Sequence, residues 1–193
     1  MKPSVFLDRD GVICEYVEEL CHRDEFVLRP GSAEGIRLLN DHGFLVFVAT
    51  NQPNIAKAKM TWDELMAVHA KMESLLLKEA GAHLDKIYFC PHRVGGSVKE
   101  FAFECHCRKP EAGMLFQAFQ EFPQADPQRS LMVGDTWRDV GCAQKAGIPC
   151  LGLFGGGGFP YPKGSEESSY QPLHMFNDLL DAAKWIIQQK NFK

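Results

Sequence analysis

The sequence predicts an α/β fold in which five parallel strands form one sheet sandwiched by helices, within a single domain spanning residues 1–193. Short apolar runs alternate with segments whose apolar residues recur at helical spacing, and this alternation is typical of parallel sheets. The runs are apolar throughout, as expected of strands that are covered on both faces. They are residues 4–7, 44–49, 86–89, 130–133 and 149–154.

Helices are predicted between these strands. One begins at Thr61, which forms a capping-box pattern with Glu64, and ends near Gly81. The last helix is expected to be capped by Asn177. Three further helices are expected over residues 32–40, 114–122 and 137–146.

Composition and charge argue against several classes of function. The net charge is −4 and no basic block is present, so neutralising a nucleic-acid backbone is not expected of this chain. No apolar run approaches the roughly 18 residues of a membrane span, and the N-terminus lacks the apolar core of a secretory signal. We therefore expect a cytoplasmic protein that binds neither nucleic acid nor membrane.

Polar residues follow three of the five predicted strands, where each strand ends. In an open parallel sheet, ligands bind outside the carboxyl ends of the strands. A single acid at such a position is more often a turn or cap residue, but the joint arrangement has no evident structural purpose. The three groups are Asp8 with Asp10, Thr50 with Asn51, and Asp135 with Asp139.

This inventory suits phosphoryl transfer through a carboxylate. A carboxylate can attack phosphorus and form an aspartyl-phosphate, and a second acid can donate and later accept a proton. Mg²⁺ suits a cluster of carboxylates beside a phosphate, while a hydroxyl, an amide and a lysine can hold the phosphate oxygens. The residue pattern itself does not choose between Asp8 and Asp10 as the nucleophile.

A second cluster of reactive residues lies between residues 90 and 109. It contains the ligand types that zinc prefers, in a set that matches a closed Cys₃His tetrahedron of the structural kind. His106, the central residue of a Cys-x-Cys pair, is the weaker candidate because its side chain should point away from its neighbours. A metal would close this long loop and deliver Arg108 and Lys109 to the sheet. The four predicted ligands are Cys90, His92, Cys105 and Cys107.

Four segments, "FLDRDGVI", "ATNQ", "RKP" and "VGDTWRD", resemble in order the four motifs of the haloacid dehalogenase (HAD) superfamily. The resemblance spans about residues 4–155 and implies a Rossmann-like fold. By that resemblance, Asp8 is the nucleophile and Asp10 the general acid/base. Thr50 and Asn51 would contact the phosphate, and Lys109 would neutralise it. Mg²⁺ would be held by Asp8, the backbone carbonyl of Asp10 and Asp135, with Asp139 as an outer acid.

The cysteine loop with its Arg-Lys-Pro triplet is similar to that of two branches of small HAD phosphatases with little or no cap. One removes the 7-phosphate of D-glycero-D-manno-heptose 1,7-bisphosphate, in a pathway that supplies heptose to lipopolysaccharide and other surface polysaccharides. The other hydrolyses histidinol phosphate. "TNQPNIAKAKMT" and "RKPEAGM" are closer to the heptose branch, and Arg108 suits the phosphate that is retained.

The resemblance therefore predicts a monomeric, Mg²⁺-dependent phosphoric monoester hydrolase that acts on a phosphorylated sugar and carries a structural Zn²⁺. Histidinol phosphate, or another small phosphomonoester, is the alternative substrate. Several positions depart from the heptose-branch pattern, among them Pro53, Asn54 and Thr136. The glycine run 155–158 matches no motif; a flexible turn is the first interpretation and a substrate-facing loop the second.

Overall fold

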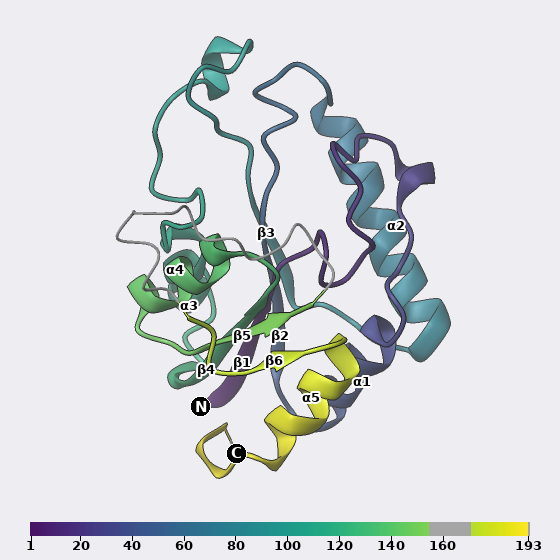
Figure 1. The fold of residues 1–193 in the computed structure, drawn as a ribbon, viewed down its shortest axis with the longest axis vertical. Coiled ribbons are helices and arrows are strands. Elements are labelled where there is room, and N and C mark those ends of the chain that lie inside the picture. Colours follow the sequence, from purple (N-terminus) through teal and green to yellow (C-terminus); the bar gives the residue numbers. More distant parts are fainter. Residues whose placement is uncertain (155–170, 193) are drawn as a thin grey trace.

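The computed structural model describes residues 1–154 and 171–192, and in them one parallel sheet forms the centre of the molecule (Figure 1). The strand order is β3-β2-β1-β4-β5-β6. The strands are β1 (Lys2–Leu7), β2 (Leu45–Asn51), β3 (Lys86–Cys90), β4 (Ala125–Gly134), β5 (Cys150–Leu153) and β6 (Met175–Phe176).

The parallel α/β sheet is confirmed, but it has six strands where five were predicted. The additional strand, β6, pairs with β5 through Met175 and Phe176. Two residues are too few to show a periodicity, so no pattern in the sequence could have indicated this strand.

The order of the strands places a topological switch at the centre of the sheet. The chain moves from β1 outward through β2 and β3, then returns to the other side of β1 to form β4 and β5. Neighbouring strands β1 and β4 pair in register from Ser4 with Ser130 to Leu7 with Val133. Ligands in such sheets bind where the strand order reverses, at the carboxyl ends. The residues that follow β1 and β4 are therefore adjacent at this point.

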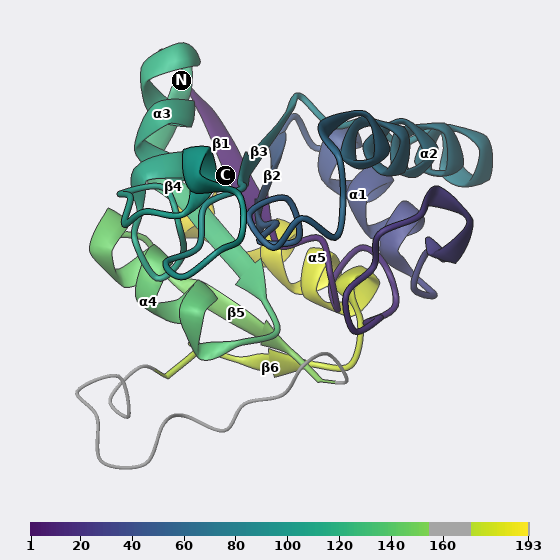
Figure 2. The same ribbon diagram turned by 90° about the horizontal axis from the view of Figure 1, so that it is seen from above.

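The helices cover the sheet in two unequal layers (Figure 2). Side chains of α1, α2 and α5 share one apolar core, whereas those of α3 and α4 belong to the other. The strand side chains alternate accordingly, since Val5 and Leu7 face the first core and Phe6 faces the second. The helices are α1 (Ser32–Asp41), α2 (Trp62–Ala80), α3 (Gly113–Glu121), α4 (Trp137–Ala146) and α5 (Leu179–Gln188).

The helix boundaries agree closely with those predicted. The Thr61 cap of α2 is confirmed, with its hydroxyl accepting from the Glu64 backbone N–H, and α4 has the predicted limits. The predicted cap of α5 is wrong by one residue. Asp178 rather than Asn177 occupies that position, because its carboxylate accepts the Asp181 N–H at 2.8 Å.

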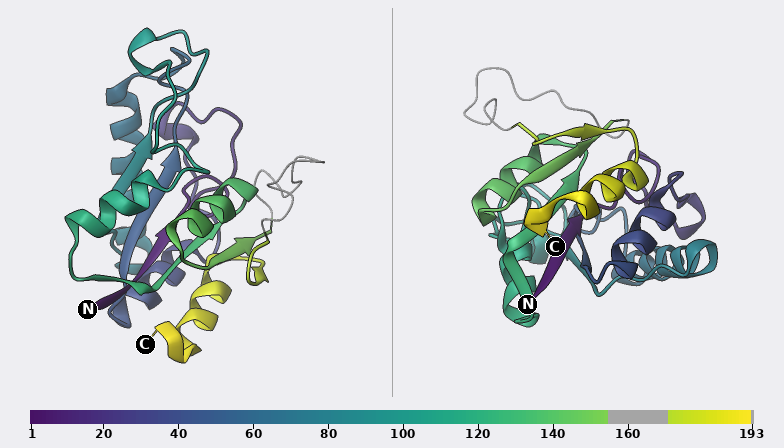
Figure 3. Two further views of the ribbon diagram at one scale, coloured as in Figure 1. Left: turned by 90° about the vertical axis from the view of Figure 1, so that its left-hand side faces the viewer. Right: turned by 90° about the horizontal axis from the view of Figure 1, so that it is seen from below.

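Long connections rise from the carboxyl edge of the sheet, and both termini lie at the opposite end (Figures 1 and 3). The connection that leaves β3, residues 91–112, contains only a single 3-10 turn, Lys99–Phe101, before α3. Two other short 3-10 turns are Arg23–Glu25 and Lys190–Phe192. None of the described helices is long and apolar enough to cross a bilayer. The glycine run 155–158 lies outside the described residues.

Candidate active site and metal centre

A buried lysine joins the acidic groups at the centre of the carboxyl edge. The Lys109 side chain is 2% exposed, and its Nζ lies 2.8 Å from Asp8 Oδ2 and 2.6 Å from Asp139 Oδ1. Asp135 follows β4 beside them, and carboxylate oxygens of Asp8, Asp135 and Asp139 lie within 4.8 Å of one another. Residues separated by more than 100 positions thus form one charged cluster.

The electrostatics of this cluster favour an additional cation. Burial raises the pKa of Asp8 to about 7, Lys109 opposes this rise, and Asp139, Asp135 and Asp10 add to it. Burial would lower the pKa of Lys109, but Asp139 and Asp8 outweigh it and raise that pKa. One ammonium group therefore does not offset three buried carboxylates, and their oxygen donors have the chemistry that Mg²⁺ prefers.

Asp139 is positioned by the start of α4 and by a glycine. Its Oδ2 accepts from the Thr136 backbone N–H at 3.0 Å and from the Thr136 hydroxyl at 2.8 Å, which leaves Oδ1 for Lys109. A Cβ added at Gly134 would lie 2.2 Å from Asp139 Cβ. Only glycine allows the Asp139 side chain to fold back over the end of β4. The sequence shows this glycine, but not what it contacts.

Asn51 holds the backbone of Lys109. Its Nδ2 donates to the Lys109 carbonyl and its Oδ1 accepts the Lys109 N–H, both at 3.0 Å. Both polar atoms of the Asn51 side chain are therefore engaged. In this arrangement Asn51 positions the lysine, and its predicted contact with phosphate stays a prediction.

Asp10 lies in a network that sequence reasoning did not anticipate. Arg9 is 1% exposed, and its Nε and Nη2 lie 3.0 Å and 2.9 Å from Asp10 Oδ1. Gln52 is 2% exposed and contacts Arg9, Asp10 and Thr50 together. In a sequence, an arginine between two aspartates is most simply interpreted as a solvent-exposed charge. Its position within "DRD" was the one sequence feature that could have indicated this buried network.

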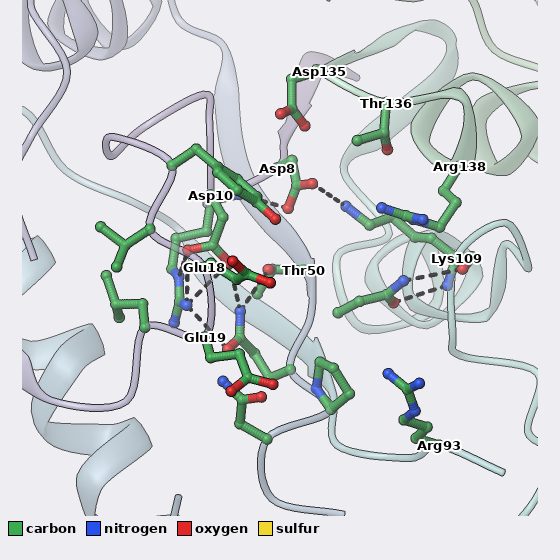
Figure 4. A pocket seen from close by; sticks show the side chains of 18 of the residues that line it. Asp8, Asp10, Glu18, Glu19, Thr50, Arg93, Lys109, Asp135, Thr136 and Arg138 are labelled. Carbon is green, nitrogen blue, oxygen red and sulfur yellow. Dashed lines mark hydrogen bonds and ion pairs between the residues drawn. The ribbon is translucent and has the colours of Figure 1, made fainter. Parts of the chain in front are cut away.

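A cavity of about 310 Å³ opens above these groups. Asp10, Glu18 and Glu19 lie on one side of it, where Arg9 and Lys57 pair with Asp10 and Glu19, and Lys109, Arg93 and Arg138 lie on the other side (Figure 4). Arg108 also lines the cavity, and its Nη1 donates to the His92 carbonyl at 3.1 Å. All of the predicted active-site residues except Asp139 therefore line one cavity, together with two arginines, Arg93 and Arg138, that were not predicted.

The second cluster brings together all four predicted zinc ligands. Cys105 Sγ lies 3.5 Å from Cys90 Sγ and 3.4 Å from Cys107 Sγ. The Nδ1 atom of His92 lies 3.6 Å from Cys90 Sγ and 3.3 Å from Cys107 Sγ. A disulfide would need about 2.05 Å, whereas zinc at about 2.3 Å from each sulfur separates two ligands by about 3.8 Å. The geometry and the donor chemistry both fit zinc.

The thiols of this cluster differ in their pKa values. Hydrogen bonding from Cys90 lowers the pKa of Cys107 to about 5, and the same contact raises the pKa of Cys90. Hydrogen bonds from the neighbouring groups thus stabilise the Cys107 thiolate. A bound metal cation would replace the protons of those hydrogen bonds. His106 is exposed and lies outside the cluster, as the sequence suggested.

A glycine also supports this loop. The Gly113 N–H donates to the His106 carbonyl at 2.9 Å, and a Cβ at Gly113 would lie 2.3 Å from that oxygen. The Cys105–Cys107 segment therefore packs against the first turn of α3 at a distance that only glycine permits. The same segment continues into Arg108 and Lys109, so the position of the loop affects the cavity directly.

Comparison with known proteins identifies the family. A family model described as HAD-hydrolase-like matches residues 106–182. D-glycero-D-manno-heptose-1,7-bisphosphate 7-phosphatase of Thermosynechococcus vestitus is 38% identical over 190 residues, covering 96% of this chain and 95% of that protein. The chain belongs to the HAD-like phosphatases.

Other members of the family agree with this assignment. D-glycero-beta-D-manno-heptose-1,7-bisphosphate 7-phosphatase of Escherichia coli K12 is 39% identical over 149 residues, 76% of this chain and 75% of that protein. The crystal structure of D,D-heptose 1,7-bisphosphate phosphatase from B. bronchiseptica, complexed with magnesium and phosphate, superposes with a TM-score of 0.80 at 29% identity, covering 97% of this chain and 99% of that chain. The resemblance seen in the motifs is therefore confirmed over nearly the whole chain.

Proposed function

We propose that this protein is a Mg²⁺-dependent phosphatase that removes the 7-phosphate from D-glycero-D-manno-heptose 1,7-bisphosphate and leaves heptose 1-phosphate. The observation that carries the chemistry is Lys109, buried between Asp8 and Asp139 at the switch point of the sheet. The substrate is supported by relatives of that name at 38–39% identity.

The reaction proceeds in two steps from the groups described. An oxygen of Asp8 attacks phosphorus, the bond between phosphorus and the sugar oxygen breaks, and Asp10 donates a proton to that oxygen. Water then attacks the aspartyl-phosphate, Asp10 accepts its proton, and phosphate leaves with Asp8 restored. Lys109 and the Thr50 hydroxyl hold the phosphate oxygens.

The magnesium ion belongs among the carboxylates. Asp8, Asp135 and the backbone carbonyl of Asp10 would hold it, and it would supply positive charge that offsets the phosphate. Asp139 would act from outside this set, since its two oxygens are engaged by Lys109 and by the start of α4. Its role is to keep the lysine charged and in place.

The charge division of the cavity suits a sugar with a second phosphate. Arg108 would bind the phosphate that is retained, with Arg93 and Arg138 nearby on the same side. The carboxylates of Glu18 and Asp10 on the opposite side can accept hydrogen bonds from sugar hydroxyls. A monophosphate would leave the basic side without a partner.

The zinc would be structural. Four protein ligands close its coordination, which leaves no position for water or substrate. Its role is to order residues 90–107 and thereby to present Arg108 and Lys109. The seven free cysteines suit a reducing compartment, which supports a cytoplasmic location. We further propose that residues 1–193 act as a one-domain monomer.

A substrate panel tests this function. Phosphate release is measured with Mg²⁺ on both anomers of the heptose bisphosphate, on histidinol phosphate and on simple sugar monophosphates. We expect kcat/KM for the bisphosphate to exceed that for the monophosphates by at least about 100-fold, from the charge-assisted contacts to the second phosphate. Equal turnover of monophosphates, or a preference for histidinol phosphate, would exclude the proposed substrate.

A pair of arginine variants sharpens the assignment. Arg108→Ala should raise KM for the bisphosphate about 10- to 100-fold and leave turnover of monophosphates nearly unchanged. Arg23→Ala removes an arginine whose side chain is 67% exposed and which does not line the cavity, so it should change neither. A parallel loss on both kinds of substrate would remove Arg108 from the second-phosphate site.

A further inference from the structure

Gln52 lies immediately after β2, among the residues that line the cavity, and no part of the proposed reaction uses it. Its amide makes three contacts: Oε1 lies 3.0 Å from Arg9 Nη2, while Nε2 lies 2.9 Å from Asp10 Oδ2 and 2.9 Å from Thr50 Oγ1. The side chain is nearly fully buried. It is the one described residue that touches both the general acid/base and the phosphate-binding hydroxyl of the proposed reaction.

The direction of each hydrogen bond in this network follows from its chemistry. A guanidinium can only donate, so the Gln52 atom facing Arg9 is the carbonyl oxygen. The amide nitrogen is then the atom that faces Asp10 and Thr50, and its two hydrogens match those two acceptors. Arg9 thereby determines which way the amide points, and exchanging its two ends would place an oxygen against the Asp10 carboxylate.

This order has a consequence for Thr50. Because its hydroxyl oxygen accepts a hydrogen bond from Gln52, its own hydrogen is directed elsewhere, and Thr50 lines the cavity. The hydroxyl is therefore set as a donor toward an anion in the cavity. Without Gln52 the hydroxyl can rotate, and its hydrogen is no longer held toward the cavity.

Asp10 is placed by the same network. Arg9 contributes Nε and Nη2 to its carboxylate, and Gln52 contributes Nε2. A general acid is effective only within hydrogen-bond reach of the oxygen that it protonates. Two buried residues that hold the carboxylate from behind limit where it can move when substrate enters.

We propose that Gln52 is a positioning residue, oriented by Arg9, that aims the Thr50 hydroxyl at the transferred phosphate and fixes Asp10 for proton transfer to the leaving oxygen. The inference rests on the proposed function. It predicts that losing Gln52 damages the reaction most when the leaving oxygen must receive a proton.

The test compares two substrates in Gln52→Glu, which keeps the shape and the Arg9 contact but cannot donate when ionised. Heptose bisphosphate releases an alkyl oxygen that needs a proton, whereas p-nitrophenyl phosphate releases a stable phenolate. We expect kcat on the sugar to fall about 100-fold and kcat on p-nitrophenyl phosphate to fall less than about 10-fold. The inhibition constant of inorganic phosphate should rise for the same variant, because Thr50 is no longer aimed.

Further variants separate positioning from charge repulsion and from loss of fold. Gln52→Leu removes the donors without adding a charge and should give the same selectivity. It also provides the test if Gln52→Glu does not fold. Gln128→Glu introduces the same change at an exposed position in the amino-terminal half of β4 and should leave both substrates unaffected. Asp10→Asn shows the full size of the leaving-group effect.

The outcomes distinguish this inference from the function on which it rests. If Asp10→Asn shows the leaving-group selectivity and both Gln52 variants lower the two rates equally, or change neither, Gln52 does not position Asp10 and the inference is overturned. If Asp10→Asn itself lacks the selectivity, Asp10 is not the general acid, and the inference falls together with the proposed role of Asp10, whereas the substrate panel tests the function itself. Selectivity in all three variants supports both.

Discussion

The two charged clusters of this protein are held in place in different ways. The acidic cluster lies at the ends of neighbouring strands β1 and β4, and its carboxylates are met by the protein's own cation, Lys109. The cysteine cluster lies on a connection with one 3-10 turn, and its thiols contact one another and the ring of His92. The first is ordered by the sheet, whereas the second would be ordered by the zinc ion proposed to bind there.

The clusters meet at three consecutive residues. Cys107 belongs to the metal cluster, Arg108 lines the cavity, and Lys109 bridges Asp8 and Asp139. A change in the loop can therefore reach the cavity over a distance of one or two residues. The proposed zinc would therefore influence substrate binding without taking part in the chemistry. Variants in each cluster can test whether the acidic cluster serves catalysis and the cysteine cluster serves the order of the loop.

Asp8→Asn should have the largest effect on turnover. Removing the nucleophile is expected to lower kcat by about 10⁴-fold or more, because the acyl phosphate of the proposed reaction forms on Asp8. The zinc content should change little, since the cysteine cluster has no contact with Asp8, whereas the melting temperature should shift because the buried Lys109 loses a charged partner. Phosphate release, metal analysis and thermal melting measure this; a loss of zinc would show that the two clusters are not separable.

Cys107→Ser should have the converse pattern. Bound zinc should fall from about one per chain, the melting temperature should drop, and KM should rise at least about 10-fold, with kcat reduced less. Cys21→Ser, at a half-buried thiol outside the cluster, is the matched control and should behave as the parent. If zinc were removed with structure and turnover untouched, the loop would not need its metal.

Two glycine substitutions separate the clusters further. Gly134→Ala places a methyl group against Asp139 and should lower kcat about 10- to 100-fold, because Lys109 loses its fixed partner. Gly113→Ala presses on the His106 carbonyl and should weaken zinc binding and raise KM instead. Each change should also cost about 1–3 kcal/mol of stability. If both variants lowered kcat, or both raised KM, the separation of catalysis in the acidic cluster from loop order in the cysteine cluster would be contradicted.

The smallest expected effect is on the stability of the fold at low pH, and it involves the buried His69. Burial, followed by repulsion from Arg9, lowers the pKa of His69 to about 3. In the unfolded chain this imidazole takes up a proton near pH 6.5, so the unfolded state binds more protons between about pH 6.5 and pH 3. Stability from His69 is therefore fully present above pH 6.5 and is lost progressively as the pH falls through this window.

His69→Gln tests this contribution. The parent should lose more unfolding free energy than the variant between pH 7 and pH 4, by up to a few kcal/mol. Because both proteins keep the same cysteine cluster, its own acid sensitivity cancels in the comparison. Parallel denaturation midpoints across this range in the two proteins would show that His69 is not held neutral.

Much of this structure was predictable because its signals are local. Continuous apolar runs indicated five strands, and polar residues at their ends indicated the cavity. The four metal ligands could be named because thiols and imidazoles rarely gather without a metal. In contrast, β6, the Asp178 cap and the bond between Asn51 and Lys109 depend on neighbours that local patterns do not reveal.

Local patterns in the sequence were enough to establish the α/β class, the chemical inventory of the site and the family, because strand burial, ligand type and motif spacing are properties of neighbouring residues. How those residues are used depends on the folded chain. Strand order brought Asp135 to Asp8, and close packing made Gly134 and Gly113 necessary. The buried amide of Gln52 became a link between Thr50 and Asp10. These roles depend on distances across the fold, which a linear chain does not specify one residue at a time.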